Sequence, residues 1–395
     1  MSRHLEGIRV VELGTNVAVP KVSRVMADWG AEVIKVEPPK GEPLRWQGVG
    51  YDMPVEPDHN PIFEVENMNK KAVTINLKTP EGHDAMIALL KSADVFVTNT
   101  RLKVLTRLGL DYETVRRENP KLIYGHFGAY GTKGPQKDDA GFDVASFWAK
   151  SGALIEWTLD SDTPFKPQPG LGDTACSAHM LSAVLASLFR RERTGEGEFL
   201  QTSLYANALW CNSIGVVCGQ PQYHHTYPKK QHTDPLFAPY RCKDGVWMTV
   251  CSPDWETLYR KVFPLIGLEA YIGDPKLDTK AAVQENYDEA AALIREAWGS
   301  YTSDEIQEKF SAAGLIIAKF ENPNDLHKDE QAWANDFLAR VTLRDGAELI
   351  VPRTPVQFAD EEVSELRIAP PIGADNEEIL SGLGLTAEQI EKATK

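Results

Sequence analysis

The first third of the chain alternates short apolar runs with segments of helical period, and this alternation constrains the fold more than any other feature. The strand-like runs cover residues 8–13, 31–36, 73–77, 94–99 and 122–127. A helical segment follows at about 20–29, and a second one begins with Thr79 and Pro80, a typical helix-start signal. Strands separated by helices form βαβ units, so we expect an α/β fold with a mostly parallel sheet. Ligands of such sheets bind outside the carboxyl ends of the strands.

The turn after the first strand argues against a dinucleotide-binding protein. The stretch ELGTNVAVP contains one glycine, Gly14, so the GxGxxG fingerprint is absent. No Walker A, HExxH or GxSxG pattern occurs elsewhere in the chain. The sequence therefore disfavours a nicotinamide-dependent oxidoreductase.

Charge and cysteine content restrict the classes of partner. The 395 residues carry a formal net charge of −15, which argues against nucleic-acid binding but leaves room for a local basic site that takes a small anion. No apolar run is long enough for a membrane helix, and the N-terminal stretch lacks the layout of a signal peptide. The five cysteines show no metal-binding spacing, which indicates reduced thiols. We therefore expect a cytoplasmic protein that binds neither nucleic acid nor membrane and holds no metal.

The pattern changes after residue 218. Residues 219–239 are rich in Pro, His, Tyr and Lys and predict an irregular connection. The following segment, to about residue 316, predicts one strand and several helices, as in a small α+β domain. We expect a large domain over 1–218, a linker with a small domain over 219–325, and a return to the large domain over 326–395.

Asp173 stands out because it follows two glycines at the start of an apolar helical segment, in PGLGDTACS. An Asp at this place is a common helix N-cap. The helix dipole and backbone donors would also keep its carboxylate ionised, and the glycines would let a substrate approach. Such a carboxylate can attack an acyl group and form an anhydride. Cys176 is a weaker candidate nucleophile, because no partner histidine is identifiable.

Other polar and aromatic residues remain ambiguous. Eight basic residues are scattered through the first third of the chain, and several of them follow strand ends, where a phosphate-bearing ligand would lie, although most such residues are solvated surface: Lys35, Arg45, Lys70, Lys71, Lys78, Arg101, Lys103 and Arg107. His224, His225 and His232 could suggest a metal, but their Pro-rich loop favours loop or interface residues. Trp148, Trp157 and Trp210 could line an apolar pocket or pack in the core.

Eight motifs together identify the chain as similar to the class III family of CoA-transferases. In chain order they are GIRVVELGTNVAVP, DWGAEVIKVEPPKGEPLR, NMNKKAVTINLKTPEG, ADVFVTNTRLKVLTRLGLDYETV, NPKLIYGHFGAYGTKGP, GFDVASFWAKSG, PGLGDTACS and RRERTGEGEFLQTSL. The stretches NPIFEVENMNKK and LHKDEQAWANDFL most resemble the subgroup that acts on (R)-2-hydroxy acids in amino-acid fermentation.

This resemblance implies a role for Asp173, which occupies the place of the family's nucleophile. The family's aspartate attacks the acyl-CoA carbonyl, forms a mixed anhydride, and then becomes an aspartyl-CoA thioester. CoA is thus a substrate, carried as its thioester, and no tightly bound cofactor is expected. The resemblance also implies CoA contacts at Ile75, Lys78, Asn99 and Arg107.

The resemblance further implies the assembly and the partners. The family has a Rossmann-like large domain built from both chain ends and a small domain, and two subunits form an interlocked-ring homodimer. The substrates would be an acyl-CoA and a small carboxylic acid, and a 2-hydroxyacyl-CoA dehydratase could act downstream.

Two family features are missing from this sequence. Val17 stands where some members have a Gln that stabilises the oxyanion, and only Gly245 stands where some have a run of glycines over the nucleophile. The subgroup acting on 2-hydroxy acids shares these absences.

Two other functions remain open. A related racemase acting on 2-methylacyl-CoA would need a general base and acid, for which His126 is the nearby candidate. A CoA-binding scaffold without activity is disfavoured by the intact Asp motif.

Overall fold

The computed structural model describes residues 3–47, 53, 59–158, 163–223, 234–251, 254–359 and 363–395. It forms two compact units. The first contains residues 1–156, 164–225 and 330–395, and the second contains residues 157–163 and 226–329. The domain boundaries expected from the sequence, at 218/219 and 325/326, stay a prediction.

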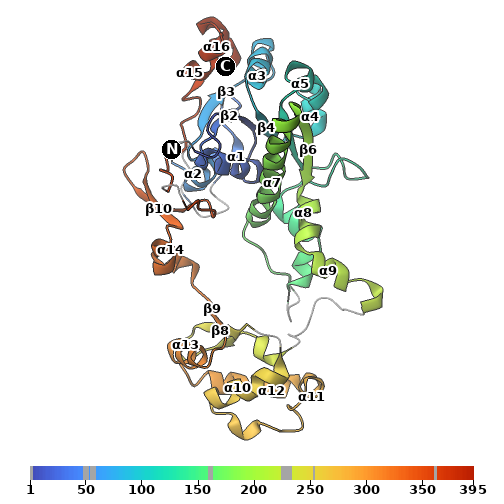
Figure 1. Ribbon diagram of the computed structural model, residues 1–395, viewed down its shortest axis with the longest axis vertical. Coiled ribbons are helices and arrows are strands. Elements are labelled where there is room, and N and C mark those ends of the chain that lie inside the picture. Colours follow the sequence, from blue (N-terminus) through green and yellow to red (C-terminus); the bar gives the residue numbers. More distant parts are fainter. Residues whose placement is uncertain are drawn as a thin grey trace. The chain divides into compact units, whose positions relative to one another are not determined.

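A six-stranded parallel sheet forms the centre of the first unit (Figure 1), as the strand–helix alternation predicted. The strand order is β3-β2-β1-β4-β5-β6. The strands are β1 (Arg9–Leu13), β2 (Glu32–Glu37), β3 (Lys71–Thr74), β4 (Val95–Thr98), β5 (Ile123–Gly128) and β6 (Glu198–Ser203). The first five match the apolar runs in the sequence, whereas β6 lies outside those runs.

Helices cover both faces of this sheet. Successive residues of a strand point to opposite faces, so Val10 packs with α1 (Ala18–Asp28) and α7 (Leu171–Thr194), while Val11 faces α3 (Pro80–Lys91). The second face also holds α4 (Leu102–Arg107), α5 (Tyr112–Glu118) and the C-terminal helices α15 (Asn376–Gly382) and α16 (Ala387–Thr394). Residues from both ends of the chain therefore belong to the same arrangement of sheet and covering helices.

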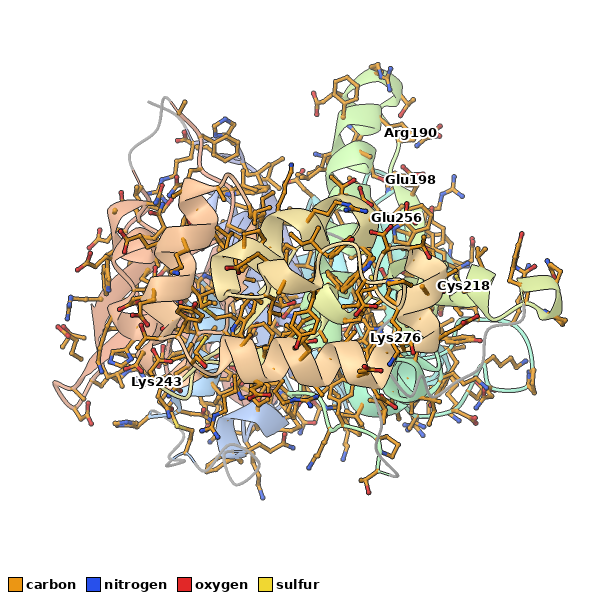
Figure 2. All side chains as sticks on the ribbon, turned by 90° about the horizontal axis from the view of Figure 1, so that it is seen from below. Arg190, Glu198, Cys218, Lys243, Glu256 and Lys276 are labelled. Atoms are coloured by element: carbon orange, nitrogen blue, oxygen red, sulfur yellow. The ribbon has the colours of Figure 1, made fainter. Side chains whose placement is uncertain are left out.

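Local signals explain where the two most informative helices begin. The Thr79 hydroxyl accepts the Gly82 N–H at 3.1 Å and Pro80 opens α3, as the sequence predicted. Helix α7 runs between Gly170 and Gly195, which both adopt positive φ, a conformation that favours glycine. Arg190, near its end, pairs with Glu198 of β6 at 3.9 Å (Figure 2).

The first unit also contains several further elements. They are η1 (Pro43–Trp46), α2 (Pro61–Asn67), η3 (Asp143–Ala149), α6 (Ala153–Glu156), α8 (Leu204–Cys211), α9 (Ser213–Cys218), η4 (Pro221–Tyr223), α14 (Glu330–Ala334), β10 (Leu338–Thr342) and β11 (Glu348–Pro352). Strands β10 and β11 pair as an antiparallel hairpin.

The second unit has its own core. A three-stranded antiparallel sheet, β7 (Tyr240–Arg241), β8 (Trp247–Val250) and β9 (Ile317–Lys319), packs with helices. The helices are α10 (Trp255–Val262), α11 (Lys280–Glu285), α12 (Tyr287–Trp298) and α13 (Ser303–Ala312), joined by the short turns η5 (Pro235–Phe237), η6 (Phe263–Ile266), η7 (Glu269–Tyr271) and η8 (Pro323–Lys328). Trp255, Tyr259 and Trp298 are fully buried in this core. The α+β composition expected for the small domain is present in this unit.

Candidate active site

A cleft of about 280 Å³ lies in the first unit where β1, β4 and β5 end. It contains side chains from the loops after these strands and from the start of α7, among them Asn99, Arg101, His126, Asp143 and Asp173. The carboxyl ends of parallel strands are the usual place for a ligand in this architecture. The position of the cleft therefore agrees with the expectation from the strand–helix alternation.

Asp143 caps helix α7 from another part of the chain. Its Oδ2 accepts the Gly170 N–H at 3.0 Å and the Trp148 indole N–H at 3.2 Å, and its Oδ1 accepts the Asp173 N–H at 3.1 Å. A Cβ added at Gly172 would collide with this carboxylate and with the Phe147 ring. The glycine is thus needed so that the helix can begin directly against Asp143.

The interpretation of Asp173 as the N-cap of α7 is therefore wrong. Asp173 is the third residue of α7, and the backbone N–H groups at this helix start donate to Asp143 instead. The local sequence could not show this, because the capping residue lies about thirty positions earlier. The available signal was the motif GFDVASFWAKSG, in which an Asp precedes an apolar helical run.

The Asp173 carboxylate has an unusual electrostatic environment. It is half-buried, and no N–H or O–H group of the described residues donates to it. Burial, followed by the negative charges of Asp143 and Glu66, raises the pKa of Asp173 to about 7, while Lys21 opposes the shift. The expectation that backbone donors keep this carboxylate ionised is wrong, because Asp143 uses those donors.

Glu66 and Lys21 form an ion pair between α2 and α1, with 3.0 Å between Lys21 Nζ and Glu66 Oε1. Burial raises the pKa of Glu66 despite this pair. The surroundings of Asp173 thus combine two other carboxyl groups with one ammonium group. A half-ionised, poorly solvated carboxylate at neutral pH can act as a nucleophile or exchange a proton.

Of the four predicted CoA-binding residues, Asn99 lines the cleft and the other three do not. Asn99 lines the cleft with Asp173, and its carboxamide holds the loop after β1, accepting the Thr15 N–H at 3.1 Å and donating to the Thr15 carbonyl at 2.9 Å. Ile75 is 2% exposed within the apolar core. Lys78 and Arg107 are exposed and do not line the cleft. These placements do not test CoA binding, which stays a prediction.

Arg101 is the strand-end cation that the structure brings into the cleft. It follows β4, is exposed, and lines the cleft together with Lys137. The sequence placed Arg101 among eight similar basic residues but gave no reason to prefer it. Its distinguishing signal was its position two residues after Asn99.

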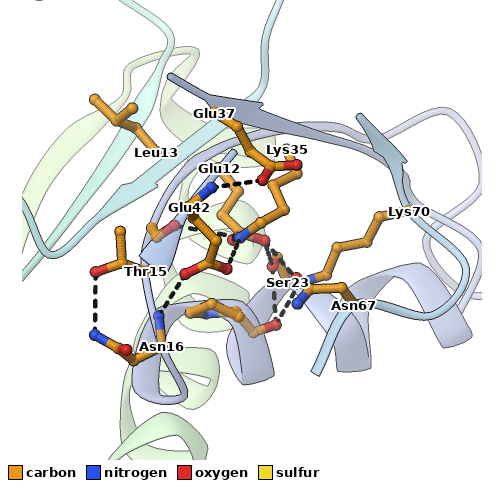
Figure 3. Close-up of polar contacts among 12 residues, drawn as sticks. Glu12, Leu13, Thr15, Asn16, Ser23, Lys35, Glu37, Glu42, Asn67 and Lys70 are labelled. Carbon is orange, nitrogen blue, oxygen red and sulfur yellow. Dashed lines mark hydrogen bonds and ion pairs between the residues drawn. The ribbon is translucent and has the colours of Figure 1, made fainter. Parts of the chain in front are cut away.

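Three other basic residues are buried in ion pairs and offer no charge to a ligand, so their assignment as candidate phosphate contacts is wrong. Lys35 and Lys70 donate to the two oxygens of Glu12 at 2.6 and 2.8 Å (Figure 3), and Arg45 pairs with Glu37 at 2.7 Å. Burial alone would raise the pKa of Glu12, but the two ammonium groups lower it to about 2. These charges stabilise one another inside the fold.

The remaining candidates lose their functional interpretation or lie outside the described residues. Cys176 is buried, and burial followed by Asp173 raises the pKa of its thiol, so it is a poor nucleophile. Trp148 is buried in the core, which is one of its two expected interpretations, whereas Trp157 and Trp210 are 57% and 72% exposed. His224, His225 and His232 lie outside the described residues.

His126 lies in the same cleft as Asp173. It is 4% exposed, and its Nε2 lies 3.1 Å from the Thr100 carbonyl. Burial lowers the pKa of His126 although this carbonyl opposes the shift. The lowered pKa favours the neutral form of the ring.

No helix of the described residues is both long and apolar enough to cross a membrane. No three His, Cys, Asp or Glu side chains in the same residues are grouped to hold a metal ion.

Comparison with known proteins identifies the family. Residues 5–376 match the sequence model of CoA-transferase family III. The chain is 34% identical to (R)-2-hydroxy-4-methylpentanoate CoA-transferase of Clostridioides difficile over 388 residues, covering 98% of this chain and 97% of that protein. It is 33% identical to cinnamoyl-CoA:phenyllactate CoA-transferase of Clostridium sporogenes over 393 residues, covering 98% of this chain and 95% of that protein.

Solved structures have the same fold. Rv3272 from Mycobacterium tuberculosis superposes with a TM-score of 0.81 at 28% identity, covering 95% of this chain and 98% of that one. A CAIB/BAIF family protein from Brucella suis gives a TM-score of 0.82 at 24% identity, covering 97% of this chain and all of the other. These likenesses show the fold, while the family match over residues 5–376 and the two CoA-transferase relatives show that the chain is a member of CoA-transferase family III.

Proposed function

We propose that this CoA-transferase moves CoA from an acyl-CoA, either a 2-hydroxyacyl-CoA or an enoyl-CoA, to a free (R)-2-hydroxy carboxylic acid, with Asp173 as the nucleophile. The two relatives named above act on 2-hydroxy acids or their derivatives, by their names. The observation that carries the proposal is the Asp173 carboxylate, which lies in the strand-end cleft with a pKa raised to about 7. Such a carboxylate is more basic than an ordinary one, and its oxygens are free to attack because they accept no hydrogen bond from the described residues.

The proposed chemistry is two balanced exchanges. An Asp173 oxygen attacks the acyl carbonyl, and the C–S bond breaks to give an acyl-aspartyl anhydride and CoA thiolate. The thiolate attacks the aspartyl carbonyl and releases the donor acid as its carboxylate, which leaves an aspartyl-CoA thioester. The acceptor carboxylate then reverses both steps, and Asp173 is regenerated. Each step exchanges one acyl–heteroatom bond for another, so no oxidant or metal is required.

CoA enters this scheme as a substrate, and Arg101 supports its binding. A cation at the mouth of the cleft suits the phosphate groups of CoA. Contacts with Ile75, Lys78, Asn99 and Arg107 remain part of the proposal, with Asn99 the only one of these beside the cleft.

An interlocked-ring homodimer is also part of the proposal. Helix α9 has no buried residue, and large apolar side chains of α8 and α9 are exposed, including Trp210 at 72% and Ile214 at 77%. Exposed apolar surface of this kind is typical of an interface between subunits. Light scattering should give twice the mass of the chain. A cytoplasmic role in amino-acid fermentation, followed by a 2-hydroxyacyl-CoA dehydratase, fits the same proposal.

The direct test is to trap the aspartyl thioester. Enzyme mixed with a 2-hydroxyacyl-CoA and hydroxylamine should lose activity and gain a hydroxamate on the peptide that contains Asp173. Asp173→Ala should abolish both transfer and trapping, whereas Asp84→Ala, a change at an exposed α3 residue, should leave both unchanged. Full activity in Asp173→Ala would refute the proposal.

The racemase alternative gives a different result in the same experiment. His126 and Asp173 share the cleft, so a proton-transfer pair is geometrically conceivable. A racemase forms no acyl-enzyme, so it would show no hydroxamate, and with a 2-methylacyl-CoA it would exchange the 2-hydrogen of the acyl group with solvent deuterium. A scaffold without activity would show neither.

A further inference from the structure

Glu42 is a buried carboxylate that contacts the loop beside the nucleophile. It lies just before η1, is fully buried, and has two partners from different elements. Its Oε2 accepts the Asn16 N–H at 2.8 Å, and its Oε1 lies 2.7 Å from Lys35 Nζ (Figure 3). Lys35 also donates to the Gly14 carbonyl at 3.2 Å. The loop of residues 14–17, between β1 and α1, is thus held by both members of one ion pair.

Asn16 needs this support because of its backbone conformation. Its φ is +63°, in the left-handed region that residues other than glycine seldom adopt. Asn tolerates this conformation better than most residues but still prefers others. A buried, charged acceptor for the Asn16 N–H selects the left-handed conformation over the alternatives.

The loop in turn determines the shape of the cleft. Thr15, Asn16 and Val17 line it together with Asp173. Val17 packs on the turn before α7, where a Cβ added at Gly170 would lie 3.3 Å from Val17 Cγ2. A shift of this loop would therefore change both the space above the Asp173 carboxylate and the support of the helix that carries it.

We propose that Glu42 is a positioning residue for acyl transfer: through the Asn16 N–H and Lys35, it fixes the loop of residues 14–17 against the start of α7. Glu42 does not line the cleft, and it acts through its partners Asn16 and Lys35. The inference rests on the proposed CoA-transferase function. Its consequence is that the rate of aspartyl adduct formation depends on a buried carboxylate outside the cleft.

The test compares Glu42→Gln with a control that breaks another buried ion pair. Asp28→Asn is suitable, because Asp28 pairs with Arg24 at 2.9 Å at the far end of α1 and does not line the cleft. Both variants should lose stability. At a temperature where both are folded, Glu42→Gln should form the aspartyl adduct about tenfold more slowly, since small misplacements at a reacting centre have effects of this size. Asp28→Asn should stay within about twofold of the unaltered enzyme.

Hydrogen exchange supplies a readout that does not need activity. The amide hydrogens of the peptide containing residues 14–18 should exchange faster in Glu42→Gln than in the unaltered enzyme. Their exchange rate should be unchanged in Asp28→Asn. If Glu42→Gln does not fold, Glu42→Asp keeps the charge beside Lys35 but shortens the reach to Asn16, and it should show the same two effects.

Two outcomes would overturn the inference. The first is a Glu42 variant that forms the adduct at the normal rate, or in which hydrogen exchange of residues 14–18 is unchanged. The second is a loss of adduct-formation rate in Asp28→Asn that equals the loss in Glu42→Gln. If the unaltered enzyme itself forms no adduct, the proposed function fails, while the exchange comparison still decides whether Glu42 holds the loop.

Discussion

The pKa of Asp173 makes the reaction sensitive to pH in a range where an ordinary aspartate is fully ionised. The surroundings raise this pKa from 3.8 to about 7. In the free enzyme the carboxylate is then about half ionised at pH 7, about one tenth at pH 6 and about one hundredth at pH 5. Only the ionised form can attack an acyl group, so the rate should fall in proportion.

The measurement is kcat/KM for the acyl-CoA between pH 5 and 9, because this ratio reports ionisations of the free enzyme. We expect an acid limb centred near pH 7, with about a tenfold loss per pH unit below it. His126 does not account for such a limb, because burial lowers its pKa below the ordinary value. A profile that is flat down to pH 5, in enzyme shown to remain folded there, would refute the reasoning.

Asp143→Asn separates the causes of the shift. The negative charge of Asp143 is the second contribution, after burial, that raises the pKa of Asp173. Asparagine removes that charge, so the acid limb should move to lower pH. Asp84→Asn, which alters an exposed carboxylate on α3, should leave the limb in place. An acid limb that does not move in Asp143→Asn would mean that another group titrates.

The same shift predicts a dependence of stability on pH. Asp173 binds its proton more tightly in the folded chain than in the unfolded chain, so folding takes up a proton between about pH 4 and pH 7. Stability should therefore fall as the pH rises through this window, by up to roughly 4 kcal/mol. Asp173→Asn removes the effect and should raise the free energy of unfolding at pH 8 but not at pH 4, as measured by urea denaturation. Equal effects at both pH values would contradict the linkage.

Two further substitutions test the geometry of the cleft. Gly172→Ala should destabilise the protein by about 2 kcal/mol and slow adduct formation, because the added Cβ has no room beside the Asp143 carboxylate. The control is Gly382→Ala, where the added Cβ meets nothing within 4 Å, and this variant should leave thermal melts and activity unchanged. Arg101→Gln should raise KM for the acyl-CoA several-fold more than Arg107→Gln, because only Arg101 lines the cleft; the opposite order in steady-state assays would favour the contacts implied by the family resemblance.

Features encoded locally were predictable from the sequence. The strand runs 8–13 and 122–127 are short and mostly apolar, and they became β1 and β5. The start of α3 was visible because Thr79 and Pro80 act within one turn. The position of the cleft followed from the strand–helix alternation, since parallel strands end at one edge of a sheet.

Features that depend on contacts between distant residues were not predictable from the local pattern. The sequence left Lys35 and Arg45 as candidate phosphate contacts or solvated surface cations, yet Glu12 and Glu37 pair with them inside the fold. The local pattern around Asp173 gave it the cap of α7, which in the structure belongs to Asp143. In each case the deciding partner is another charged residue from a different element, and hydrophobic periodicity carries no information about it.

The assignment of the cap to Asp143 bears directly on the proposed chemistry. A nucleophilic carboxylate that also capped its own helix would lose those hydrogen bonds each time it became acylated, because an anhydride or thioester oxygen is a weaker acceptor. Here Asp143 accepts the Gly170 and Asp173 N–H groups. The start of α7 can therefore keep its hydrogen bonds while Asp173 passes through the carboxylate, anhydride and thioester forms. The division of tasks between the two carboxylates also explains why Asp173 has a raised pKa: the donors that would lower it are used to hold the helix on which it lies.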